Sequence, residues 1–223
     1  FSFGIIYLGS LNEALLNLTA GTYTITIADS NSGENDQYAT DTITLDDPEE
    51  LIFSNVSAGN TDEIEEGEYT LNCFGDSNGY IDIEISGGCG NYIYEWIGSS
   101  GFNSNNASIS SLSAGMYTLT VADENDCSIE TTIFITQPPE ISLSSEIMSN
   151  YNGYNISCNG ELDGFINIEL EGGQPFTDVD GNPYYEYSWS NLETSQNISD
   201  LLVGNYTLVV TDSMDCTSSF DFE

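Results

Sequence analysis

The sequence predicts an all-β protein made of tandem sandwich domains. Short runs of alternating apolar and polar residues predict strands, and Gly- and Asn-rich segments between them predict turns. A third observation is that the whole pattern recurs at intervals of about 90 residues, the size of one small β-sandwich. No segment has the apolar periodicity of a helix.

The repeat is clearest in two stretches that begin with cysteine. Residues 73–88 read CFGDSNGYIDIEISGG, and residues 158–173 read CNGELDGFINIELEGG. In the first stretch Ile81 and Ile83 flank Asp82, and the alternation continues to the Gly-Gly pair. A period of two residues predicts a strand with one buried face and one solvated face.

An aromatic strand follows in each repeat, and its aromatic residues share one face. They are Tyr92, Tyr94 and Trp96 in one repeat and Tyr185, Tyr187 and Trp189 in the next. Farther on, Leu-x-x-Gly-x-Tyr leads into another strand at Tyr117 and at Tyr206. A Trp on the third strand and a Tyr at the start of the sixth are typical of an immunoglobulin-like sandwich with a tyrosine corner. An unrelated barrel or a jelly roll is the alternative.

Proline-containing segments mark the boundaries between repeats. TLDDPEELIF (44–53) and TQPPEISLS (136–144) occupy equivalent places. We therefore expect the C-terminal part of a repeat at residues 1–47, a complete repeat at 48–138 and a nearly complete one at 139–223.

The first repeat is predicted to begin in its aromatic strand, at FGIIYLGS (residues 3–10). A partial sandwich exposes its core and a sheet edge, so we expect the protein to continue in both directions.

The charge composition excludes several functions. The chain of 223 residues carries 37 Asp and Glu and no Lys, Arg or His, for a net charge of −37. Nucleic acids and anionic membrane surfaces are bound mainly by cationic side chains, so neither is an expected partner. Catalysis by His or Lys and metal binding by His are impossible. No apolar run reaches the roughly 20 residues of a membrane helix, so no membrane insertion is expected.

The ordered motifs resemble the SprB-type repeat, named for the gliding-motility adhesin of Bacteroidetes. They are Cys-x-Gly-x-x-[Asn/Asp]-Gly-x-Ile, Gly-Gly, Tyr-x-Tyr-x-Trp and Leu-x-x-Gly-x-Tyr-Thr-Leu-x-Val-x-Asp. The resemblance implies an extracellular protein of the cell surface, exported by type 9 secretion, whose tandem repeats form a long filament. Its implied partners are neighbouring repeats and further copies in the filament, and no enzymatic activity is implied. The alternative is a glycan- or matrix-binding module of a secreted protein, built on exposed aromatic residues.

Five cysteines in an exported protein predict disulfides. One pairing lies within repeats, joining Cys73 to Cys127 and Cys158 to Cys216. Those positions fall at opposite ends of an immunoglobulin-like sandwich, about 23 Å apart, whereas bridged Cα atoms lie about 6 Å apart. Topology therefore favours a Cys73–Cys216 bridge between repeats. Cys127 and Cys158 would then pair with repeats outside this chain. Cys89 would be left unpaired among these, either as a lone thiol or as a cross-link to another chain.

The carboxylates are candidates for calcium binding and for catalysis. The candidate calcium loops hold Asp76, Asn78 and Asp82, and Asp178, Asp180 and Asn182, with further carboxylates at Asp46, Asp47, Glu49 and Glu50. Oxygen ligands in turns suit Ca²⁺, but Asp and Asn are also ordinary turn residues. No other cofactor is expected. A catalytic carboxylate pair is disfavoured because the acidic residues point outward along strands and recur in each repeat.

Overall fold

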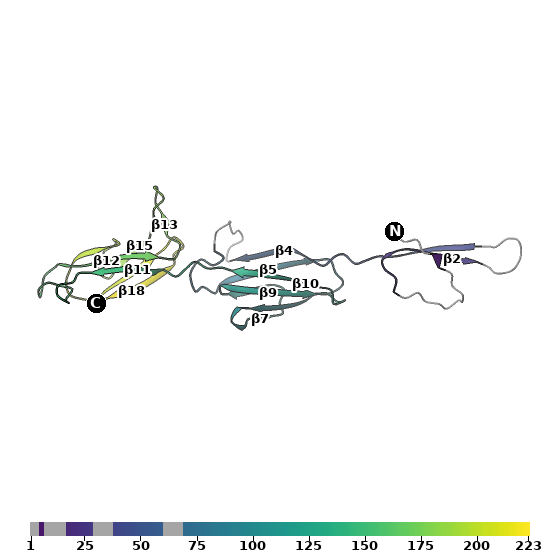
Figure 1. The fold of residues 1–223 in the computed structure, drawn as a ribbon, viewed down its shortest axis with the longest axis horizontal. Helices are drawn as coiled ribbons and strands as arrows, with labels where there is room; N and C mark the ends of the chain where they lie inside the picture. Colours follow the sequence, from purple (N-terminus) through teal and green to yellow (C-terminus); the bar gives the residue numbers. More distant parts are fainter. Residues whose placement is uncertain (1–4, 7–16, 29–37, 60–68) are drawn as a thin grey trace.

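The structure, a computed structural model, describes residues 5–6, 17–28, 38–59 and 69–223. The strands form three groups that lie in a row along the long axis (Figure 1). We call them unit one (β1 to β3), unit two (β4 to β10) and unit three (β11 to β18). The proximal end of a unit is where the chain enters it, and the distal end is where the chain leaves.

Unit two is a sandwich of two antiparallel sheets. One sheet has the order β4-β5-β8, with β4 at Ile52–Gly59, β5 at Gly79–Ser86 and β8 at Ile109–Leu112. The other has the order β10-β9-β6-β7, with β6 at Ile93–Gly98, β7 at Asn103–Ser104, β9 at Gly115–Ala122 and β10 at Ser128–Ile135. This two-layer arrangement confirms the predicted immunoglobulin-like fold class.

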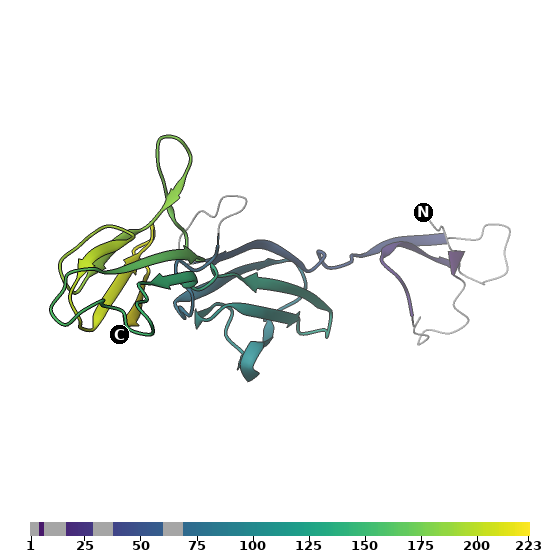
Figure 2. The same cartoon turned by 60° about the vertical axis from the view of Figure 1, so that its left-hand side comes forward.

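Unit three repeats the sandwich. Its sheets have the orders β11-β12-β16 and β15-β17-β18. Their strands are β11 (Ser142–Met148), β12 (Gly164–Glu171), β15 (Glu186–Trp189), β16 (Ile198–Leu201), β17 (Tyr206–Thr211) and β18 (Thr217–Phe222). The insertion at 177–183 forms a hairpin of β13 (Phe176–Thr177) and β14 (Pro183–Tyr184), which projects sideways (Figure 2).

Unit one contains β1 (Ile5–Ile6), β2 (Gly21–Ala28) and β3 (Tyr38–Leu45). β2 and β3 pair antiparallel, as β9 and β10 do in unit two. β1 runs parallel to β2, whereas the aromatic strand β6 runs antiparallel to β9. The predicted equivalence of residues 3–10 with the aromatic strand is therefore wrong for Ile5 and Ile6. The rest of that segment lies outside the described residues.

Helical structure is minor in the part of the chain that the structure describes. The 3-10 turn η1 (Ser99–Gly101) follows β6. Within the described residues, no helix is long and apolar enough to cross a membrane.

Units two and three each have their own core. The predicted alternation is confirmed in β5, where Ile81 and Ile83 are buried and Asp82 is exposed. The centre of unit two holds Trp96, Leu119 and Val121, and the centre of unit three holds Trp189, Leu208 and Val210. Each indole N–H donates to a backbone carbonyl, that of Asn106 or Ser195, at 2.9 Å. Burial of the indoles therefore leaves no donor unsatisfied.

The tyrosine corner predicted from the sequence is present in all three units. The Tyr117 hydroxyl donates to the Ser113 carbonyl at 2.9 Å, and Tyr206 donates to Leu202 at 2.9 Å. The Tyr23 hydroxyl bonds to the carbonyl four residues before it in the same way. Each bond fixes the turn that leads into the strand carrying the tyrosine.

We expect Tyr117→Phe to lower the free energy of unfolding of unit two by about 1–2 kcal/mol, because it leaves the Ser113 carbonyl without its donor. Urea unfolding followed by Trp fluorescence measures the loss. Tyr94→Phe is the matched control, since the Tyr94 hydroxyl has no hydrogen-bond partner among the described residues. Equal losses for the two variants would contradict a specific role of the corner.

Candidate functional site: the joint between repeats

Units two and three meet end to end, with the distal end of unit two against the proximal end of unit three. A disulfide joins Cys73 to Cys216, with their Cα atoms 5.5 Å apart. Beside it, the Gln174 side-chain amide donates to the Asn72 carbonyl at 3.1 Å. This is the pairing between repeats that the sandwich topology favours. The joint is thus covalent and also hydrogen-bonded.

The Gly-Gly pair that closes the repeated sequence holds the incoming linker at the proximal end of unit two. Gly87 and Gly88 have φ of +77° and +68°, which favour glycine. A Cβ on Gly87 would lie 1.8 Å from the Glu50 carbonyl oxygen, so only glycine fits. The Gly88 N–H donates to the Glu49 carbonyl at 2.7 Å, and the Tyr92 hydroxyl donates to the Gly87 carbonyl at 2.7 Å.

The same turn recurs at the proximal end of unit three. A Cβ on Gly172 would lie 1.9 Å from the Glu140 carbonyl oxygen. The Gly173 N–H donates to the Pro139 carbonyl at 2.8 Å, and the Tyr185 hydroxyl donates to the Gly172 carbonyl at 2.6 Å. The linker therefore enters both sandwiches along the same path.

A buried carboxylate organises the residues of unit three that reach unit two. One oxygen of Asp212 accepts the N–H groups of Met214 at 2.9 Å and Cys216 at 3.0 Å. Its other oxygen accepts the N–H of Gln174 at 2.8 Å. Gln174 and Cys216 are the two residues that bond to unit two, so Asp212 positions both of them.

Asp123 accepts backbone N–H groups at the proximal end of unit two, as Asp212 does in unit three. It accepts the N–H groups of Asn125 at 2.9 Å and of Cys127 and Cys89 at 3.0 Å. Burial alone would raise the pKa of Asp123, but these N–H groups together hold it below its usual value. Cys127 thus occupies the place of Cys216, and Cys89 occupies the place of Gln174.

The spacing of residues in the sequence marks these two carboxylates. Asp123 and Asp212 each precede a cysteine by four residues. An Asp that accepts the N–H groups of the following residues forms an Asx-type turn, so Asp-x-x-x-Cys is a turn that presents a cysteine. No sequence pattern marks the role of Gln174, because the equivalent residue in unit two is Cys89 and not a glutamine.

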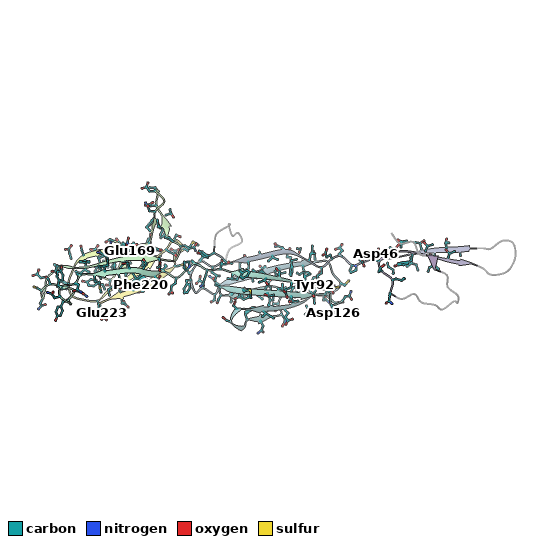
Figure 3. The ribbon with its side chains drawn as sticks, viewed as in Figure 1. Asp46, Tyr92, Asp126, Glu169, Phe220 and Glu223 are labelled. Carbon is teal, nitrogen blue, oxygen red and sulfur yellow. A yellow bond between two sulfur atoms is a disulfide. The ribbon has the colours of Figure 1, made fainter. Side chains whose placement is uncertain are left out.

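The unpaired cysteines lie at both ends of the pair of sandwiches. Cys127 and Cys158 are exposed thiols, and Cys89 is half-buried. In Figure 3, Asp126, the neighbour of Cys127, marks the end of unit two that faces the linker at Asp46. Cys158 lies at the distal end of unit three. The pairing of Cys127 and Cys158 with other repeats stays a prediction.

The candidate calcium loop in unit two is spread over a turn and a strand. The Asp76 N–H donates to the Cys73 carbonyl at 3.3 Å in the turn, whereas Asp82 lies on the solvent face of β5. Asn78 is exposed between them. Among the described residues, no three Asp, Glu or Cys side chains form a group that could hold a metal.

The second candidate loop is the tip of the β13–β14 hairpin. One oxygen of Asp178 accepts the N–H groups of Asn182 at 2.8 Å and Asp180 at 2.9 Å, and the Asn182 side-chain amide also reaches the carboxylate. These bonds, led by that from the Asn182 backbone, lower the pKa of Asp178. The four linker carboxylates are exposed. Calcium binding at these loops stays a prediction.

The aromatic strands do not form a carbohydrate-binding face. Trp96 is 0% exposed and Trp189 is 2% exposed. Both indoles belong to the sandwich cores, where a ligand cannot reach them. The glycan-binding alternative therefore loses the two residues on which it depended.

Comparison with known proteins finds one family model that matches parts of this chain. The model of the SprB repeat matches residues 71–101 and 151–194. Two segments of this chain are thus similar to the SprB repeat. The first segment spans the cysteine loop, β5 and β6, and the second spans the equivalent part of unit three. The resemblance inferred from the sequence motifs is confirmed.

Among solved structures, the chain is similar to the Sidekick-1 immunoglobulin domains 1-5. The similarity has 12% identity and a TM-score of 0.26, and it covers 91% of this chain and 44% of that one. This chain therefore spans less than half the length of that structure. No curated protein has a sequence that matches this chain significantly.

SprB repeats and immunoglobulin-like sandwiches are structural and adhesive domain types, and SprB repeats are typical of cell-surface proteins. The matched segments and the fold together indicate a repeat region of the cell-surface adhesin type.

The lowered pKa of Asp123 makes the stability of unit two depend on pH. A depressed pKa in the folded state stabilises the fold above the unfolded value of about 3.9, and this stability is lost as the pH falls through the folded value. We expect the Tm of the native chain to exceed that of Asp123→Asn at pH 6, and the difference to shrink below about pH 4. Thermal unfolding followed by circular dichroism from pH 2 to 7 measures it.

Asp126→Asn is the control for this measurement, because Asp126 is an exposed carboxylate in the same turn. It removes the same charge and leaves the N–H groups around Asp123 in place. A Tm difference between native protein and Asp123→Asn that does not change with pH would contradict the assignment.

Proposed function

We propose that this chain is a non-enzymatic structural and adhesive segment of a long extracellular filament on a bacterial cell surface, of the gliding or surface-adhesin type. The observation that carries the proposal is the Cys73–Cys216 disulfide, which joins two sandwiches end to end. A catalytic or ligand-binding module needs no covalent bond between consecutive domains. In a load-bearing fibre such a bond is useful, because force on the chain is then shared between the linker and the bridge.

The joint restricts how units two and three can move against each other. Three connections cross it: the linker at residues 136–141, the disulfide, and the hydrogen bond from Gln174 to Asn72. A single flexible linker would allow the sandwiches to swing freely. The linker and the disulfide attach unit three to unit two at two points, and the hydrogen bond lies beside the disulfide. This attachment reduces that freedom, so the pair behaves as a rod.

The charge of the chain favours the same extended form. With 37 carboxylates and no cationic side chain, every unit repels its neighbours. Repulsion between exposed charges weakens with salt over a Debye length of about 8 Å at physiological ionic strength. Side-by-side packing of units is therefore disfavoured, because it brings many carboxylates close together. End-to-end contact brings together only the small surfaces at the ends of two units.

The wider assignment follows from the SprB repeats. We propose that the partners of this segment are neighbouring repeats of one long chain and further copies in a filament, and that the protein reaches the cell surface through type 9 secretion. Adhesion to external surfaces is then carried elsewhere along the filament, since the tryptophans of units two and three, Trp96 and Trp189, are buried in their cores.

We expect small-angle X-ray scattering of the native chain to give the profile of a rod, with one long maximum dimension. Cys73→Ser should keep both sandwiches folded, as judged by Trp fluorescence, but shift and broaden the distance distribution between units two and three. Cys89→Ser is the control, because Cys89 makes no disulfide. A compact native particle, or a scattering profile that Cys73→Ser leaves unchanged, would contradict the proposal that the chain forms a rod.

A further inference from the structure

Two of the free thiols lie beside the same buried carboxylate. Cys89 and Cys127 come from separate loops at the proximal end of unit two, and their N–H groups bond to the two oxygens of Asp123 at 3.0 Å each. Cys89 is half-buried and Cys127 is exposed, and both carry free thiols in the structure. Asp126, the neighbour of Cys127, marks this end of unit two in Figure 3.

Backbone hydrogen bonds hold the two loops in one frame. The Glu124 N–H donates to the Cys89 carbonyl at 3.0 Å, and the Asp123 N–H donates to the Cys127 carbonyl at 2.9 Å. With the two bonds to the Asp123 carboxylate, four hydrogen bonds connect the two cysteines to residues 123 and 124. The position of Cys89 relative to Cys127 is therefore fixed by backbone groups.

Unit three has the same frame with a different side chain in one place. The Ser213 N–H donates to the Gln174 carbonyl at 2.9 Å, and the Asp212 N–H donates to the Cys216 carbonyl at 3.0 Å. The bonds from the N–H groups of Gln174 and Cys216 to the Asp212 carboxylate are 2.8 and 3.0 Å long. Each of these four bonds matches its equivalent in unit two within 0.2 Å, so unit three shows where side chains at the two places point.

In unit three the two side chains converge on one atom. Nε2 of Gln174 lies 3.1 Å from the Asn72 carbonyl oxygen, and Sγ of Cys216 lies 3.3 Å from the same oxygen. The two side-chain atoms are therefore no more than about 6.4 Å apart, the sum of these distances. Side chains at the places of Cys89 and Cys127 thus point to one region, and rotation about χ1 moves a cysteine sulfur among three staggered positions.

The other three cysteines lie away from this pair. Cys73 and Cys216 are bonded to each other at the opposite end of unit two. Cys158 belongs to unit three. Within the described part of the chain, Cys127 is therefore the thiol that the fold places beside Cys89.

We propose that Cys89 and Cys127 are a redox-active pair of thiols that forms a disulfide within unit two. Gln174 occupies the place of Cys89 in unit three, so unit three has no such pair. The Cys89–Cys127 bond and the predicted bridge from Cys127 to another repeat exclude each other, because both need the Cys127 sulfur. Oxidation within unit two therefore prevents that bridge. This inference goes beyond the proposed rod and does not depend on it.

The bond forms by thiol–disulfide exchange with a disulfide oxidant such as oxidised glutathione. The exposed Cys127 thiolate attacks the oxidant, and the half-buried Cys89 then attacks the resulting mixed disulfide. Cys89 and Cys127 each lose one proton and together lose two electrons, and the oxidant is reduced to two thiols.

The test maps the thiols of the folded native chain. The protein is held at a fixed ratio of oxidised to reduced glutathione, free thiols are alkylated, and a Glu-specific protease cleaves the chain without reduction. Cleavage after glutamate places each of the five cysteines in a different peptide. We expect mass spectrometry to find peptide 85–95 linked to peptide 125–130. Cys158 is the internal control, because it is an exposed thiol of another unit, and links to it should be at least tenfold rarer.

Gln174→Cys transfers the arrangement to the known joint. It places a thiol beside Cys216, as Cys89 lies beside Cys127 in unit two. We expect the new thiol to compete with Cys73 for Cys216, so the alkylated fraction of Cys73 should rise at least fivefold above that in Gln174→Ser. Gln174→Ser is the matched control, because it also removes the hydrogen bond to Asn72 but adds no thiol.

The native chain decides the inference whatever the variant shows. If Cys89 and Cys127 stay reduced or pair only with glutathione while Cys73–Cys216 forms, the inference is overturned and the proposed rod is not. Equal alkylation of Cys73 in Gln174→Cys and Gln174→Ser would contradict the shared geometry on which the inference rests. Loss of Cys73–Cys216 in the native chain would count against the proposed function instead.

Discussion

The close approach of the incoming linker to the Gly-Gly turn is the constraint on which the rest of the structure depends. With no Cβ at Gly87 or Gly172, the linker carbonyls of Glu50 and Glu140 can lie directly against the turn. That contact fixes where each sandwich begins. The turn beside it carries the buried aspartate, and in unit three that aspartate, Asp212, positions Cys216, which bonds to unit two. One steric requirement therefore sets the geometry of the whole joint.

A chain without cations must satisfy its buried carboxylates in another way. Asp123 and Asp212 are buried, and backbone N–H groups are the donors to both of them. No buried side-chain nitrogen or oxygen lacks a partner among the described residues. Backbone donors are fixed in space, so they orient the carboxylate and the turn together. At the joint, Asp212 is therefore held by backbone N–H groups.

The negative charge and the joints act together. Repulsion between like-charged units opposes lateral packing but does not set an angle between consecutive units. The disulfide and its neighbouring hydrogen bond set that angle at one end of each sandwich. At its distal end, unit three exposes Leu162, Leu202 and Val203 where unit two has Ser77, Ser113 and Ala114.

The sequence by itself determined the fold class and the length of the repeat, because alternation of residues and recurring turns are local signals. It also predicted the buried Trp96 and Trp189 and the tyrosine corners. The bridge partners followed only from a model of the topology, and the roles of Asp123, Asp212 and Gln174 were not recognised. The parallel pairing of β1 and the contacts of the Gly-Gly turns with Glu50 and Glu140 were decided by tertiary structure alone. Each depends on which backbone groups come together across distant parts of the chain, and residue spacing does not contain that information.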